Sequence, residues 1–329
     1  MPAAFDPPEV TAWVDAAHAR YAGSLLDVMG DAVELIGVGG PDAAAADLCR
    51  GAGPGLEPVG DLRRLLLDRP ADCLLVAVRG GIGGELLAAA AEQGTRVVTT
   101  EPPAGSLQEL DEPWLRAAAG AVLEVPRFDR SPGVEAALDP LSAVGPPVQA
   151  RLISHGRADE GSLFARLLDA WRAVLRFVEL PENLLAAWSP PPGAETLRAA
   201  GGRVAVLARC RGGSTVSLDV AADAARSRRS LRLLGSEAQV EVDDAGYVRL
   251  PLEEAAPDLS EPLPPAGPAT SFVDQVAARW RRHLHHPDEP GPGLSHDAEA
   301  LACVEAMRLS ARTGEPESPG RLLRLRGRG

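Results

Sequence analysis

From Val10 to about Val144, short apolar runs alternate with longer stretches rich in alanine and leucine. This alternation is typical of units in which a helix joins two parallel strands and covers one face of their sheet. The run Cys73–Val78 is apolar throughout, as expected of a strand that is buried on both faces. Residues 1–144 are therefore predicted to form an α/β domain around a parallel sheet.

The predicted elements of this domain follow the same pattern. Its strands are expected at Val10–Val14, Val33–Val38, Cys73–Val78 and Thr95–Thr99. Its helices are expected at Ala16–Met29, Asp42–Arg50, Leu62–Asp68 and Glu85–Gln93. Gly94 follows the last of these helices, where glycine is the preferred terminating residue.

The pattern changes near Gly145. A strand is expected at Val148–Ser154, a long helix at Ser162–Leu180, and further strands at Val204–Arg209, Thr215–Val220, Ser230–Leu234, Ala238–Val242 and Tyr247–Leu250. Strands that follow one another through short turns favour an antiparallel sheet. Residues 145–318 are thus predicted to form an α+β domain with an open, mostly antiparallel sheet. Residues 251–268 are expected to be a linker or crossover, followed by helices at Ser271–His285 and Ser295–Arg312 and a flexible tail at 319–329.

The composition excludes several kinds of chemistry and of partner. The sequence contains no lysine, so all 33 basic residues are arginines, against 46 acidic residues and a net charge of −13. A guanidinium holds anions but cannot act as an amine base or a Schiff-base nucleophile, so lysine chemistry is excluded. The acidic charge and an aromatic content of 4% argue against nucleic acid and against an anionic membrane as partners.

Cysteine usage and the amino-terminal segment indicate a location. Cys49, Cys73, Cys210 and Cys303 lie far apart, and the first 30 residues lack the basic segment of a secretory leader. The thiols are therefore expected to be reduced core residues. Since no uninterrupted apolar run reaches the roughly 18 residues that cross a bilayer, we expect a cytoplasmic protein without a membrane partner.

Four segments carry a resemblance to a known family. A strand, a helix and the next strand of that family are similar to Ala71–Val78 with Leu87–Val98, and its Glu-Lys-Pro signature falls at Thr100–Ala104. The family's entry to the second domain resembles Ala143–Val148, and its final helix resembles Glu305–Pro316. The family is the Gfo/Idh/MocA oxidoreductases, named after glucose-fructose oxidoreductase, inositol dehydrogenase and MocA. The resemblance spans about residues 10–318. It implies a Rossmann-like domain, an open-sheet domain, and hydride transfer between NAD(P) and a sugar-like hydroxyl.

Two departures from this family concern the cofactor. The family has a glycine-rich turn after its first strand, but no glycine occurs between Met1 and Tyr21. Side chains in the turn expected from Asp15 to Arg20 would crowd the diphosphate, and Asp15 would repel it. The family also ends its second strand in an acidic residue that holds the adenine ribose, whereas Asp42 comes later than that position.

A third departure concerns catalysis. The family handles the hydroxyl proton with the Lys of Glu-Lys-Pro and with an Asp and a His on the first helix of the second domain. Pro102 stands at the Lys position here, and the matching helix has no His and a single Asp, Asp169. Acid–base catalysis needs a group whose pKa can approach the working pH, which neither Pro nor Arg supplies.

These departures predict a degenerate member of the fold that has lost NAD(P)-dependent hydride transfer, binds no cofactor or binds NAD(P) weakly, and acts as a binding, regulatory or partner subunit. The alternative is an active NAD(P)-dependent oxidoreductase on a sugar-like or cyclic hydroxy substrate, with a non-standard cofactor loop. Its substitute acid would be Glu101, His155 or Asp169. Both interpretations stay open at the level of sequence.

The candidate ligand loop follows the strand Cys73–Val78. The candidate cofactor-binding residues are Asp42, Arg79, Gly80, Gly81, Gly83 and Gly84. Backbone amides of such a glycine-rich loop, next to Arg79 and a helix N-terminus, favour a small anion such as a phosphate or carboxylate, and an unoccupied flexible loop is the alternative. The family resemblance also implies a small sugar-like ligand.

Other charged clusters receive simpler interpretations. His283, His285 and His286 have no completing ligand at useful spacing, so no metal site is predicted. The clusters Arg226–Arg229 and Arg321–Arg328 are expected to be solvent-exposed, although the first could instead reach a pocket or a partner.

The second sheet is the expected interface. Val204, Val206, Val216 and Leu218 alternate with other residues as a half-buried sheet requires. We expect this sheet to pair with a second copy of the chain or with a homologue, as the resemblance implies.

Overall fold

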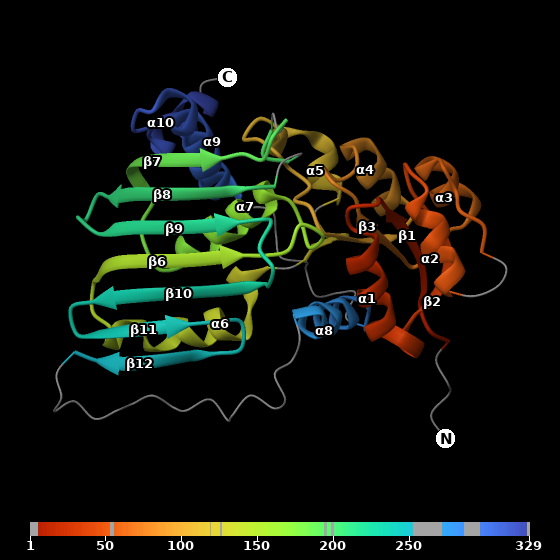
Figure 1. Ribbon diagram of the computed structural model, residues 1–329, viewed down its shortest axis with the longest axis horizontal. Helices are drawn as coiled ribbons and strands as arrows, with labels where there is room; N and C mark the ends of the chain where they lie inside the picture. The colour runs from red at the N-terminus through yellow and green to blue at the C-terminus, as the bar shows by residue number, and fades with distance from the viewer. Residues whose placement is uncertain are drawn as a thin grey trace.

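Two sheets lie side by side, and helices pack around and between them (Figure 1). The computed structural model describes residues 6–52, 56–118, 120–125, 127–193, 196–198, 201–252, 272–285 and 297–327. The five-stranded sheet has the order β2-β1-β3-β4-β5, and the seven-stranded sheet has the order β12-β11-β10-β6-β9-β8-β7. The predicted fold class, a Rossmann-like parallel sheet followed by a mostly antiparallel one, is confirmed.

All strand pairs of the first sheet are parallel. Its strands are β1 (Glu9–Val14), β2 (Glu34–Gly39), β3 (Cys73–Ala77), β4 (Arg96–Thr99) and β5 (Val122–Glu124). Its helices are α1 (Ala19–Met29), α2 (Ala44–Ala52), α3 (Leu62–Asp68), α4 (Gly84–Glu92) and α5 (Pro113–Ala118). Every residue of β3 is buried, which explains its uninterrupted apolar sequence. Gly39 also bridges Val59 in parallel, so the sheet continues past β2 by one residue pair.

The second sheet is antiparallel except for the central pair of β6 and β9. Its strands are β6 (Pro147–His155), β7 (Pro181–Ser189), β8 (Arg203–Cys210), β9 (Thr215–Ala221), β10 (Arg228–Gly235), β11 (Ala238–Val242) and β12 (Tyr247–Pro251). Helices α6 (Pro132–Leu138), α7 (Leu163–Val174) and α9 (Asp297–Thr313) cover one face. Among the described residues no helix covers the other face, which is turned to the viewer in Figure 1.

Two predictions in the second half are wrong. The helix expected to continue to Leu180 ends at Val174, and an unpredicted strand, β7, begins at Pro181, at the first strand position, where proline is tolerated. The tail expected to be flexible forms helix α10 (Pro319–Arg326) instead. Its Leu322 and Leu323 pack against the core, so apolar burial orders this segment.

Helix α8 (Phe272–His285) returns from the second half to the first sheet, where it lies beside α1 in Figure 1. Its Trp280 is fully buried in a cluster with Leu25 and Met29 of α1. Residues 253–271, which contain most of the predicted linker, lie outside the described part of the chain.

The residues expected to form an interface are core residues. Val204, Val206, Val216 and Leu218 expose 0%, 2%, 1% and 3% of their surface because their face of the sheet packs against helices of the same chain. The four cysteines are buried free thiols, as predicted.

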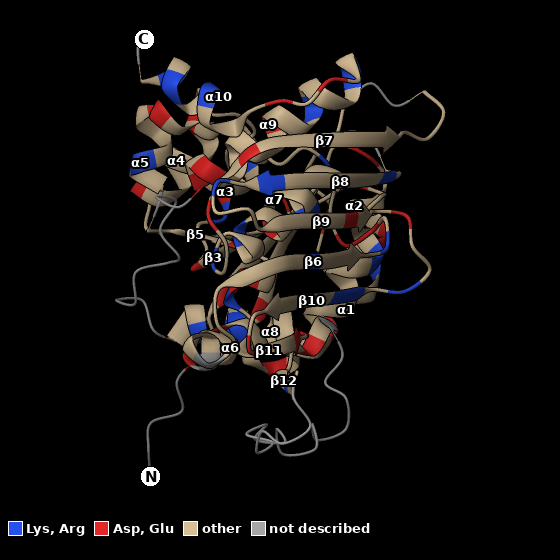
Figure 2. Ribbon diagram, turned by 90° about the vertical axis from the view of Figure 1, so that its left-hand side faces the viewer, with Lys and Arg blue, Asp and Glu red and all other residues tan. Residues whose placement is uncertain are grey.

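Two further properties concern the surface. No helix among the described residues is long and apolar enough to cross a bilayer. On the side seen in Figure 2, arginines and acidic residues lie interspersed on α4, α5 and α10.

Candidate functional site

The carboxyl ends of the parallel strands face helix α7 of the second half (Figure 1). In open α/β sheets, ligands bind outside this edge. A groove of about 720 Å³ lies away from this edge, between α1, α2 and the start of β2. The loops at the carboxyl edge are therefore the candidate site.

The turn after β1 is closed by its own carboxylate. Asp15 accepts hydrogen bonds from the backbone amide of His18 at 3.0 Å and from the amide of Arg79 at 2.7 Å. Its Oδ1 also lies 2.7 Å from Nδ1 of His18, a side chain that is 1% exposed. Burial raises the pKa of Asp15, but these hydrogen bonds outweigh it and lower the pKa below its usual value. The carboxylate thus lies where the N-terminus of α1 would receive an external anion.

A second carboxylate fills the same turn from the β2 side. Asp42 accepts from the amide of Ala16 at 2.9 Å and from the amide of Ala44 at 2.9 Å. Gly40 lets the two loops approach, because a Cβ there would lie 2.1 Å from the carbonyl oxygen of Val14. Asp42, a candidate cofactor-binding residue, therefore accepts hydrogen bonds from the chain's own backbone. Helix α1 begins at Ala19 rather than Ala16 because these contacts hold the turn.

The predicted glycine-rich loop after β3 is held by internal partners. The amide of Arg79 donates to Asp15, and the carbonyl oxygen of Gly80 accepts from Arg198 at 3.2 Å. Gly80 and Gly81 have φ angles of +84° and +73°, which favour glycine. Gly84 packs under Trp114, whose ring would lie 2.1 Å from a Cβ. Gly83 precedes α4 as its N-cap residue.

Glu101, predicted as a substitute acid, joins the two halves. It is 1% exposed, and its two carboxylate oxygens accept from the amide and the hydroxyl of Ser162, each at 2.6 Å. Burial raises the pKa of Glu101, and the two bonds from Ser162 work against that rise. Ser162 is the N-cap residue of α7, so Glu101 stabilises the start of that helix.

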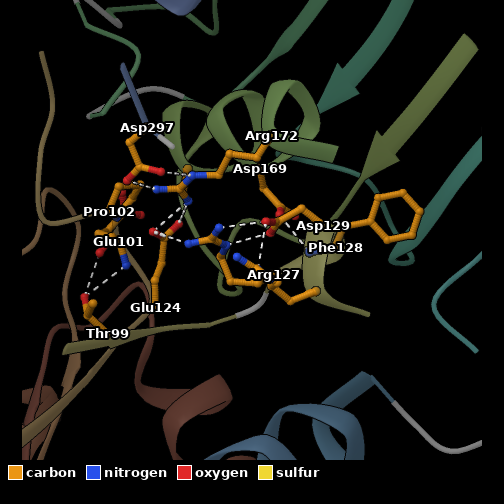
Figure 3. A network of polar contacts seen from close by, with 12 residues as sticks. Thr99, Glu101, Pro102, Glu124, Arg127, Phe128, Asp129, Asp169, Arg172 and Asp297 are labelled. Atoms are coloured by element: carbon orange, nitrogen blue, oxygen red, sulfur yellow. Dashed lines mark hydrogen bonds and ion pairs between the residues drawn. The ribbon is translucent and has the colours of Figure 1, made fainter. Parts of the chain in front are cut away.

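A buried guanidinium forms the first part of the polar network in Figure 3. Arg172 of α7 donates through Nη1 to both oxygens of Glu124, each at 2.7 Å. It donates to Asp297 at 2.7 Å through Nε and at 2.5 Å through Nη2. Because Glu124 ends β5 and Asp297 begins α9, one side chain connects both halves of the molecule.

The second part of the network surrounds the short 3₁₀ turn Phe128–Arg130. Arg127 donates to Asp129 at 2.7 Å and 2.8 Å, and the amide of Phe128 donates to Asp169 at 2.7 Å. Burial raises the pKa of Asp129, but the Arg127 guanidinium outweighs it and lowers that pKa to about 2.

Arg229 reaches this network from β10. Its guanidinium lies 2.5 Å from Asp244, 3.5 Å from Asp169 and 5.5 Å from the ring centroid of Phe128. The prediction that Arg226–Arg229 is solvent-exposed is therefore wrong for Arg229, which is 7% exposed.

Asp169 is the predicted substitute acid that lies at a cavity. Burial raises the pKa of Asp169 to about 6, with the nearby Arg229 opposing that rise. The cavity has a volume of about 10 Å³, close to the space that one water needs. It is lined by Thr100, Glu124, Ser154, Glu160, Gly161, Ala165, Arg166, Asp169 and Arg229.

His155, another predicted substitute acid, does not line this cavity. It alternates with Ser154 along β6, so it points to the uncovered face of the sheet, where Nε2 lies 3.3 Å from Asp219. His283 and His285 end α8, and the described residues contain no group of three or more potential metal ligands. His286 lies outside the described residues.

Sequence reasoning missed His18, Arg198, Glu124 and Asp297. The absence of glycine from the β1–α1 turn was a signal for an unusual turn, but nothing in the sequence pattern pointed to the partners of Arg198 or Arg172.

Comparisons with known proteins identify the fold. No family profile and no curated protein matches the sequence. The WlbA dehydrogenase from Bordetella pertussis, solved with NADH and UDP-GlcNAcA, superposes with a TM-score of 0.70 at 18% identity over 95% of this chain and 98% of its own. Levoglucosan dehydrogenase, solved with NADH and L-sorbose, gives 0.65 at 15% identity over 94% and 99%. An oxidoreductase from Agrobacterium radiobacter, solved with NAD+, L-tartaric acid and magnesium, gives 0.64 at 15% identity over 95% and 99%. The chain has the fold of Gfo/Idh/MocA oxidoreductases, as its sequence resemblance implies.

The raised pKa of Asp169 predicts a pH dependence of stability. A carboxyl group whose pKa is about 6 when folded and about 3.9 when unfolded binds its proton more tightly in the folded state. Stability relative to the Asp169→Asn variant should therefore rise by about 2–3 kcal/mol as the pH falls from about 7.5 to about 4. Urea unfolding of both proteins across this range measures the difference.

The exposed Asp68, paired with Arg64 on the surface, provides the matched control. Asp68→Asn should give a curve parallel to that of the unchanged protein. A constant difference between the unchanged protein and Asp169→Asn at every pH would contradict the assignment.

Proposed function

We propose, from the shared fold and from the occupied turn after β1, that this chain is a non-catalytic relative of NAD(P)-dependent oxidoreductases that serves as a binding, regulatory or partner subunit. The single observation that carries the proposal is that two backbone amides already donate hydrogen bonds to carboxylates of the same chain. Those of Ala16 and His18, in the turn that leads into α1, already donate to Asp42 and Asp15. A dinucleotide diphosphate would need the same donors.

The magnitude of this competition is large enough to abolish useful binding. A hydrogen bond to a charged group contributes about 1.5–3 kcal/mol. Competition for two such bonds removes about 3–6 kcal/mol, which weakens a micromolar affinity, worth about 8 kcal/mol, to roughly 0.1 mM or weaker. The two carboxylates that remain in the turn also repel the phosphate charges.

The substrate side supports the same proposal. Pro102 offers no proton, and the polar residues of α7 are engaged with other side chains. Arg166 lies 3.2 Å from Glu160, and Arg172 is held by Glu124 and Asp297. A cavity of about 10 Å³ leaves no space for a sugar-like substrate beside Asp169.

A second candidate function is an active NAD(P)-dependent oxidoreductase. One observation favours it: Asp169, whose pKa is raised to about 6, lines the cavity between the two halves and could exchange a proton near neutral pH. In that case a rearranged β1–α1 turn would hold the cofactor, and the proteins of the same fold that were solved with NAD+ or NADH would be functional as well as structural relatives.

Calorimetric titration with NADH and with NADPH separates the two functions. The non-catalytic proposal predicts no saturable binding heat at cofactor concentrations up to about 0.1 mM, for the energetic reason given above. Levoglucosan dehydrogenase, which has been solved with NADH, serves as the positive control. Micromolar affinity of this chain for either cofactor would contradict the non-catalytic proposal and favour the active oxidoreductase.

The uncovered face of the second sheet supports a partner role. Leu185 of β7 and Leu207 of β8 are cross-strand neighbours on it and expose 43% and 65% of their surface. Val248 and Leu250 of β12 are exposed as well. Exposed apolar side chains at both edges of an open sheet face favour association, so we place the interface on this face, with a second copy of the chain or with a homologue. A cytoplasmic location, with buried reduced thiols, is part of the same proposal.

Light scattering coupled to size exclusion tests this interface. The chain mass is 34.3 kDa, so a homodimer should scatter as about twice that mass. Leu207→Glu should return the protein to the monomer mass because it places a charge within the apolar contact. Leu67→Glu, a change at an equally exposed leucine on α3, should not alter the mass. A dimer that persists in Leu207→Glu would remove this face as the interface.

A further inference from the structure

Arg198 connects the second half of the molecule with two loops of the first. It belongs to the segment Thr196–Arg198 between β7 and β8. Its Nη1 donates to the carbonyl oxygen of Gly80 at 3.2 Å, and its Nη2 donates to the carbonyl oxygen of Pro102 at 3.2 Å. These carbonyls follow β3 and β4, so a single guanidinium crosses the carboxyl edge of the parallel sheet.

An aromatic ring completes the surroundings of this guanidinium. The Cζ atom of Arg198 lies 5.0 Å from the ring centroid of Phe164 on α7. Carbonyl oxygens and the face of an aromatic ring both attract a planar cation. Gly105 leaves the necessary room, because a Cβ at this position would lie 2.5 Å from Nη2 of Arg198.

The neighbouring residue ties the same segment to the start of α7. Leu197 is 6% exposed, and its carbonyl oxygen accepts from the amide of Phe164 at 3.3 Å. Phe164 lies in the first turn of α7, where backbone amides have no partner within the helix. Protection of this amide therefore reports directly on whether the segment is in place.

We propose that Gly80, Pro102 and Phe164 form a subsite for a planar guanidinium cation, which Arg198 of the same chain occupies. The subsite is separate from the two amides on which the proposed function rests, since none of its three residues contacts Asp15 or Asp42 through a side chain.

Residue-resolved amide hydrogen exchange tests the proposal. In Arg198→Ala, the exchange rate of the Phe164 amide should rise about tenfold or more, because its acceptor is no longer held in place. The amide of Ala165 is the internal control, since it donates to the side chain of Ser162 and not to the segment. Its rate should stay unchanged. Equal increases at both amides would indicate fraying of α7 and would overturn the proposal.

Binding of a free guanidinium tests the specificity of the subsite. N-methylguanidinium at millimolar concentration should shift the amide resonance of Gly81, next to the Gly80 carbonyl, saturably in Arg198→Ala, whereas sodium chloride at equal ionic strength should not. Arg211→Ala is the matched control variant, because Arg211 is an exposed arginine paired only loosely with Glu182. It should show no change at Phe164. Absence of a saturable shift with N-methylguanidinium in Arg198→Ala would contradict a cation subsite.

Gly105→Ala provides an independent variant that keeps Arg198. The new methyl group should displace the guanidinium and raise the exchange of Phe164 as Arg198→Ala does. Unchanged exchange in Gly105→Ala would contradict the proposed position of the guanidinium.

NADH titration of Arg198→Ala distinguishes this inference from the proposed function. Binding there would refute the occupied-turn account while leaving the cation subsite intact.

Discussion

The turn that leads into helix α1 has backbone amides that can bind an anion, and in this molecule two carboxylates of the same chain bind there. Asp15 accepts hydrogen bonds from the backbone amides of His18 and Arg79, and Asp42 accepts one from the amide of Ala16. The loops after β1, β2 and β3 are thereby connected without any ligand. Carboxylates that already lie at a helix N-terminus weaken its preference for phosphate. The non-catalytic proposal depends on this local charge arrangement more than on the missing lysine.

The same principle extends across the junction of the two halves. Glu101 binds the start of α7, and Arg172 joins β5, α7 and α9 through two carboxylates. Burying so many charges is costly, and each is tolerated only because its partner is present. Removal of one member of a buried ion pair typically costs about 3–5 kcal/mol. Residues at the carboxyl edge of the parallel sheet therefore contribute to the cohesion of the molecule.

Much of the fold could be predicted from the sequence because local patterns determine it. The apolar run of β3 and the alternation along β8 give the correct strands, whereas Leu175–Leu180 continued the helical pattern and concealed the start of β7. The candidate site was only partly accessible. Asp42, Arg79 and Glu101 were identified by position, but their partners were not. Arg172 finds Glu124 and Asp297 at sequence separations of 48 and 125 residues, and Arg198 finds Pro102 at 96. Such contacts leave no periodic signal in a single sequence.

The central claim is that the chain's own carboxylates occupy the amides of Ala16 and His18. Its most direct test is the nuclear magnetic resonance signal of these two amides during addition of inorganic pyrophosphate. The account predicts that both signals stay in place in the unchanged protein up to about 10 mM, and that they move in the Asp15→Ala, Asp42→Ala double variant, whose donors are exposed. Saturable movement at micromolar pyrophosphate in the unchanged protein would contradict the account.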